Sequence, residues 1–132
     1  MTTILDHYDI QPVTVALVPV KHTDYCTMVI ETDRTFYVKK PPLQIIKDAC
    51  LQGYSTYDGR RNAIIHITGY KRKVPILINL RLKIFAFPTL SPEQFECIWI
   101  FPPHIISIKA STSKGKSIQS VITFKNGQKL LL

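Results

Sequence analysis

Acidic residues are scarce in the second half of this 132-residue sequence. Residues 59–132 contain twelve Lys or Arg and two Glu, whereas residues 1–38 contain five acids and two bases. A catalytic site built from paired carboxylates is therefore hard to place. The net charge of +8 is concentrated after residue 58, and this asymmetry favours one cationic side over a uniformly basic surface.

Cysteine and histidine are also few. The three cysteines, at positions 26, 50 and 97, fit neither a disulfide framework nor the ligand spacing of a zinc site. We therefore expect reduced, buried thiols in a cytosolic protein. The four histidines are scattered; His22 lies four residues from Cys26, but no second ligand pair completes a site. No metal and no cofactor are expected.

Long apolar runs and catalytic motifs are missing as well. No segment approaches the roughly 18 apolar residues of a membrane span, and the N-terminus has no signal-peptide pattern. No G-x-S-x-G, H-E-x-x-H or G-x-G-x-x-G occurs, and Gly115-Lys116-Ser117 has Ala110 where a phosphate loop needs glycine. We therefore expect a single domain over residues 1–132 that is not an enzyme, lies in the cytoplasm and contacts no membrane.

The apolar content of 45% is ordinary for a globular domain, and its pattern predicts an α+β fold. The fold expected is an antiparallel β-sheet, or barrel-like strands, with a pair of short helices near residues 42–69. Asn126-Gly127 predicts a hairpin turn between the last two strands. A polar loop is expected at residues 111–117. The predicted strands are residues 14–20, 27–31, 35–38, 76–79, 83–87, 97–101, 104–109, 120–124 and 129–132.

Two helices are predicted in the middle of the chain. The first starts at Pro42, carries an apolar stripe at helical spacing and stops at Gly53. The second is favoured after Ser55 or Thr56, which can cap it, and ends at Gly69. Its β-branched residues would also fit a strand.

The stretch 54–83 carries seven basic residues against one acid, with the charges in clusters between apolar runs. A fixed cationic surface on a small domain indicates a polyanion, most commonly nucleic acid; a solvated face that only aids solubility is the alternative. Helix N-termini favour phosphate, so basic residues in the first turns of the second helix are candidates. The predicted DNA-contacting residues are Arg60, Arg61, Lys71, Arg72, Lys73, Lys39 and Lys40.

The order of several short motifs resembles the competence transcription factors of Gram-positive bacteria, the ComK family. Each motif is weak alone, but their order and spacing together are specific and cover nearly the whole chain from about residue 30. The matching residues are 36–38, Lys40, 42–46, Cys50, Ser55, Tyr57, 59–61, Lys73, 75–76, 84–85, 87–91, Cys97, 99–100, Val121, 123–124 and 126–127.

The resemblance implies a cytoplasmic, nucleoid-associated activator of DNA-uptake genes. It implies binding to paired A/T-rich boxes of double-stranded DNA, largely through the minor groove, as a homodimer or a pair of dimers, with bending of the DNA. It also implies an adaptor that hands the protein to a Clp protease. Family members continue well beyond Leu132 with a segment used for adaptor binding and activation. We therefore expect a DNA-binding domain that is truncated at its C-terminus.

Two other functions stay open at this point. One is a protein-interaction or inhibitory module that associates with a full-length relative through a sheet edge or an apolar patch. The other is RNA binding through Tyr54, Tyr57 and Tyr70, although helix packing is the commoner role for such tyrosines.

Overall fold

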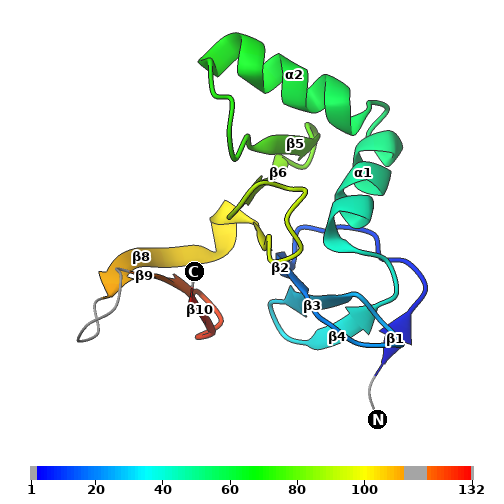
Figure 1. Cartoon of the computed structure of the whole chain (residues 1–132), viewed down its shortest axis with the longest axis vertical. Helices are drawn as coiled ribbons and strands as arrows, with labels where there is room; N and C mark the ends of the chain where they lie inside the picture. Colours follow the sequence, from blue (N-terminus) through cyan, green and yellow to red (C-terminus); the bar gives the residue numbers. More distant parts are fainter. Residues whose placement is uncertain (1–2, 112–118, 132) are drawn as a thin grey trace.

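The computed structural model describes residues 3–111 and 119–131, which form two β-sheets and two α-helices (Figure 1). The α+β fold predicted from the sequence is confirmed. The expected polar loop at 111–117 falls almost entirely outside the described residues, as does Gly115-Lys116-Ser117. Within the described part of the chain, no helix is both long and apolar enough to cross a membrane.

The larger sheet has seven strands, and every neighbouring pair is antiparallel except β1 and β4. Its central pairing, β2 with β7, joins segments about 80 residues apart in the sequence. In spatial order the strands are β1 (Ile4–Leu5), β4 (Thr35–Val38), β3 (Thr27–Glu31), β2 (Thr14–Pro19), β7 (Trp99–Ile100), β6 (Ile84–Pro88) and β5 (Ile76–Asn79).

The smaller sheet has the order β10 (Lys129–Leu131), β9 (Gln119–Phe124), β8 (Ile105–Ser111). The predicted turn at Asn126-Gly127 joins β9 to β10, and Gly127 adopts the positive φ of 89° that such a turn requires. A short 3₁₀ helix, η1 (Pro102–His104), separates β7 from β8, where the sequence places two prolines.

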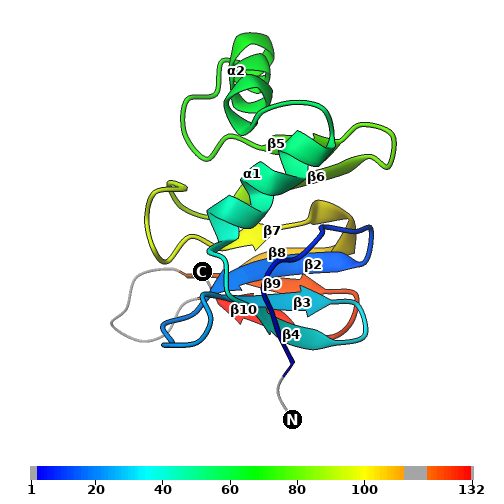
Figure 2. The ribbon, with the colours of Figure 1, turned by 90° about the vertical axis from the view of Figure 1, so that its right-hand side faces the viewer.

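The large sheet is covered on both faces at β2, β3 and β7, and these strands alternate accordingly (Figures 1 and 2). Leu17, Val29 and Trp99 lie in a core with α1 (Pro42–Gln52), while Val15, Ile30 and Ile100 pack against the smaller sheet. Adjacent strand residues point to opposite faces, so one strand supplies both cores.

Helix α1 buries Ile45, Ile46, Ala49 and Cys50, the stripe that the sequence predicts. Burial raises the pKa of the Cys50 and Cys97 thiols, as expected for inert core cysteines. Cys26 was expected to be buried but is only half-buried.

A buried hydrogen-bond network ties the N-terminal segment to the large sheet. The Tyr8 hydroxyl donates to Oε2 of Glu31 at 2.6 Å and lies 2.6 Å from Oγ1 of Thr14. Oε1 of Glu31 accepts from Nε of Arg34, also at 2.6 Å. The Glu31 residue is only 2% exposed, so these partners stabilise a carboxylate that burial alone would disfavour.

Replacing Tyr8 by Phe is expected to make the protein less sensitive to alkaline pH. The Tyr8 pKa is raised because burial disfavours the phenolate and because the hydroxyl donates to Glu31. Above pH of about 10 the unfolded chain loses this proton while the folded chain keeps it, so stability falls by about 1.4 kcal/mol per pH unit. Phe cannot ionise. Urea unfolding at pH 9 and pH 11 should therefore show that the free energy of unfolding falls less between these pH values in Tyr8→Phe than in the unchanged protein. An equal fall in both proteins would contradict this role of Tyr8.

Candidate nucleic-acid interface

Helix α2 (Tyr57–Thr68) lies outside the two-sheet body, beside β5 at the edge of the large sheet (Figure 1). Its ends follow the predicted signals: the Thr56 side chain accepts a hydrogen bond from the Gly59 N–H, and Gly69 ends the helix at φ 77°. None of its residues is buried. Ile64 and Ile65 are half-buried and Ile67 is exposed, so capping and a few contacts with β5 and α1 hold the helix in place.

The segment that follows α2 brings four of the predicted residues together. Nη2 of Arg61 donates to the Lys71 carbonyl, with the two atoms 3.5 Å apart. A cleft of about 370 Å³ separates this segment from the loop after β6, and we call it the basic cleft. It is lined by Arg61, Lys71, Arg72, Lys73, Val74, Leu90, Ser91, Pro92 and Gln94.

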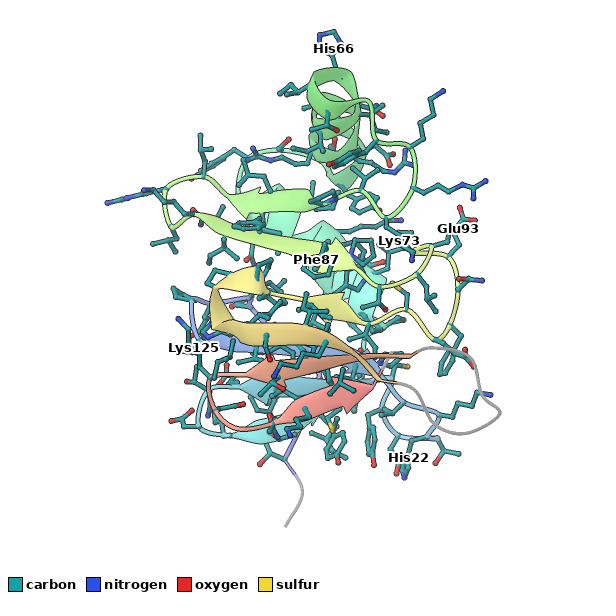
Figure 3. All side chains as sticks on the ribbon, turned by 90° about the vertical axis from the view of Figure 1, so that its left-hand side faces the viewer. His22, His66, Lys73, Phe87, Glu93 and Lys125 are labelled. Carbon is teal, nitrogen blue, oxygen red and sulfur yellow. The ribbon has the colours of Figure 1, made fainter. Side chains whose placement is uncertain are left out.

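The cations of the basic cleft form no ion pair in the part of the chain that the structure describes. No salt bridge there involves Arg61, Lys71, Arg72 or Lys73, and no acidic side chain lines the cleft. Four cations and one nearby acid, Glu93 between the lining residues Pro92 and Gln94 (Figure 3), leave a net positive charge at the cleft that attracts an anionic ligand.

Lys73 takes a backbone conformation that the sequence does not reveal. Its φ is +50°, in the left-handed region, which costs a non-glycine residue about 1–2 kcal/mol. The chain turns sharply there and enters β5 through Val74, which is buried, and Pro75. Lys73 therefore sits at a fixed corner, exposed beside the cleft (Figure 3).

Arg60 is placed differently from Arg61, although the two are neighbours in sequence. Its Nη2 donates to the Gly53 carbonyl at 3.2 Å, and its Nε is buried without a hydrogen-bond partner among the described residues. Arg60 also lies close enough to Cys50 to oppose the rise in that thiol's pKa. This guanidinium therefore attaches α2 to the end of α1.

Lys39 and Lys40 lie at the end of β4, in the lower half of Figure 1, whereas α2 lies at the top. Nζ of Lys39 is 3.2 Å from Oδ1 of Asp6, and Nζ of Lys40 donates to Oδ2 of Asp48 at 2.8 Å. The Lys40 hydrogen bond lowers the Asp48 pKa. The structure therefore does not bring this pair to the basic cleft, and their DNA contact stays a prediction.

An apolar groove beside the cleft was not predicted. Tyr70, Phe85 and Phe87 line it together with Arg72 and Lys73, and its volume is about 430 Å³. Figure 3 shows Phe87 and Lys73 on the same side of the molecule. The alternation Ile84, Phe85, Ala86, Phe87 was a usable signal, because the buried Ile84 and Ala86 leave both phenylalanines on the opposite face.

Of the three tyrosines considered for RNA stacking, two are exposed to solvent and one packs against the core. Tyr57 packs against the main core, with its ring edge-on to Trp99 at a centroid distance of 6.4 Å. Tyr54 and Tyr70 are exposed. Tyr57 is thus a packing residue of α2, which leaves no continuous stacking platform of all three.

Two comparisons with known proteins match nearly the whole chain. The family model described as ComK protein matches residues 5–132. The competence transcription factor of Bacillus subtilis (strain 168) is 33% identical over 129 residues, which cover 97% of this chain and 65% of that protein. The chain thus spans about two thirds of that relative's length. No solved structure matches. On this evidence, the chain belongs to the ComK protein family.

Proposed function

We propose that this chain binds double-stranded DNA as a transcriptional regulator of competence genes. One observation carries the proposal: Arg61 and Lys71–Lys73 line one cleft and form no ion pair with an acid among residues 3–111 and 119–131. Clustered cations of this kind supply the phosphate contacts that give sequence-independent affinity and fix register on a duplex. The assignment to competence genes comes from the similarity to the competence transcription factor of Bacillus subtilis.

The preferred target in this proposal is A/T-rich DNA, read largely through the minor groove. A narrow A/T-rich minor groove has an enhanced negative potential that attracts Arg and Lys. Paired boxes would be bound by two copies of the chain, because a twofold site is matched by a twofold protein. The resemblance to the competence transcription factor extends the proposal to activation of these genes in the cytoplasm, at the nucleoid, and to delivery to a Clp protease by an adaptor.

Binding of an A/T-box duplex and of a scrambled duplex of the same length, at two salt concentrations, tests the proposal. Four neutralised phosphates per bound chain predict a slope near −3.6 for the logarithm of affinity against the logarithm of salt concentration, so affinity should fall by about 150-fold between 50 and 200 mM salt. The A/T-box duplex should bind more tightly than the scrambled one at both concentrations. Equal affinities for the two duplexes would contradict the proposed sequence preference. A salt slope near zero would contradict the proposed phosphate contacts.

A further inference from the structure

The turn between β5 and β6 presents two leucines to solvent. Leu80 is 69% exposed and Leu82 is 53% exposed, and they alternate with the exposed cations Arg81 and Lys83. Tight hairpin turns are usually made of Gly, Asn, Asp or Ser, which favour turn conformations and interact well with water. Large apolar side chains at these positions leave more than half of their surface exposed to water. Their presence calls for a partner that covers them.

This turn is held in one conformation. Oδ1 of Asn79 accepts a hydrogen bond from the Leu82 N–H at 2.9 Å, and the Lys83 N–H donates to the Leu80 carbonyl at 3.4 Å. Lys83 has a φ of +56°, and the flanking residues Asn79 and Ile84 are paired across the hairpin. A pre-formed protrusion loses little conformational entropy when it binds.

We infer that the β5–β6 turn is a wedge for the DNA minor groove. Leu80 and Leu82 enter the groove and partly unstack one base-pair step, while Arg81 and Lys83 contact the phosphates on either side. Proteins that bend DNA from the minor groove use this combination, with an apolar side chain between base pairs and cations nearby. The inference rests on the proposed function and adds a second contact to it.

The wedge and the basic cleft can meet one duplex. Lys73 and Leu80 flank β5 on opposite sides, and seven residues at about 3.3 Å each separate them by up to roughly 23 Å. Half a turn of B-DNA is about 17 Å along the axis. In this binding mode, the span is long enough for the cleft to contact the phosphate backbone about half a turn away from the step that the leucines open.

A duplex carrying 2-aminopurine at successive positions tests the inference, because the emission of this base rises when it is unstacked. Binding of the unchanged chain should raise emission at one or two adjacent positions. The variant Leu80→Ser/Leu82→Ser should abolish that rise and reduce DNA bending, measured by energy transfer between the duplex ends. Its affinity should fall by less than about tenfold, since burying the leucines and unstacking the bases offset each other. The salt slope should not change, because no phosphate contact is lost.

Leu51→Ser is the matched control, because Leu51 is 61% exposed but lies on α1. It should leave emission, bending and affinity unchanged. An emission rise that persists in Leu80→Ser/Leu82→Ser, or binding of the unchanged chain without any rise, would overturn the wedge and leave the proposed function intact. No affinity of the unchanged chain for any duplex would overturn both.

Discussion

Arg61→Ala is expected to lower DNA affinity by about tenfold while leaving the free energy of unfolding unchanged. Arg61 lines the basic cleft, and its hydrogen bond to the Lys71 carbonyl is long, at 3.5 Å, so the fold gains little from it. A charge-assisted contact to a phosphate contributes about 1.5 kcal/mol or more. The salt slope should become about one unit less steep, because one counterion fewer is released.

Arg60→Ala is expected to lower the free energy of unfolding by about 1–3 kcal/mol, because it removes the donor to Gly53 from a partly buried position. Its salt slope should stay unchanged. Successive residues of a helix are separated by about 100° around the axis, so adjacent arginines face different partners. The DNA contact that the sequence predicts for each arginine stays a prediction; only the three-dimensional positions show that Arg60 reaches the Gly53 carbonyl and that Arg61 lines the basic cleft.

Lys125→Ala serves as the control for charge alone. Lys125 is exposed at the end of β9, far from α2 in Figure 3, and the substitution changes the net charge by the same amount as Arg61→Ala. Affinity should hardly change. If Lys125→Ala and Arg61→Ala weakened binding equally, the long-range field of the whole chain would explain it. If Arg60→Ala rather than Arg61→Ala reduced the salt slope, the assignment of the two arginines would be reversed.

Elements with strong local signals were predictable from the sequence. The apolar stripe after Pro42 predicted α1, and the capping residue Thr56 and the terminating Gly69 predicted α2. Asn126-Gly127 predicted the last hairpin, and all three predictions are confirmed. Each depends on residues close together in the chain, where capping and turn geometry decide the outcome. The strand expected at residues 97–101 is shorter, at Trp99–Ile100, because only these residues find a partner on each side.

Long-range contacts were not predictable. The two-residue strand β1 pairs in parallel with β4, and a dipeptide carries no pattern that could indicate a partner. The pairing of Lys39 with Asp6 and of Lys40 with Asp48 depends on how β1, β4 and α1 meet. Composition therefore identified the basic residues but could not tell which of them lack an acidic neighbour.

The position of α2, and with it the basic cleft, depends on a close backbone approach at Gly53. A Cβ atom at this position would lie 2.7 Å from the carbonyl oxygen of Ile78 in β5, closer than real Cβ contacts allow. The Gly53 N–H donates to the Ala49 and Cys50 carbonyls at 3.1 and 3.0 Å, and its own carbonyl accepts from Arg60. Gly53 is thus held from both sides and cannot move away from β5 without breaking these bonds.

Gly53→Ala is therefore expected to lower the free energy of unfolding by about 1–3 kcal/mol, the usual cost of forcing extra atoms into a packed contact. Denaturant unfolding measures it. Gly59→Ala is the comparison: its Cβ would lie 2.9 Å from Oγ1 of Thr56, the hydroxyl that caps α2, so this side chain must move, and the helix preference of alanine, up to about 1 kcal/mol, offsets part of the weakened cap. Equal stabilities of the two variants would show that the linker tolerates the added methyl group. If Gly53→Ala also weakens DNA binding, while Gly59→Ala binds normally, the contact between the α1–α2 linker and β5 is what presents Arg61 and Lys71–Lys73 together.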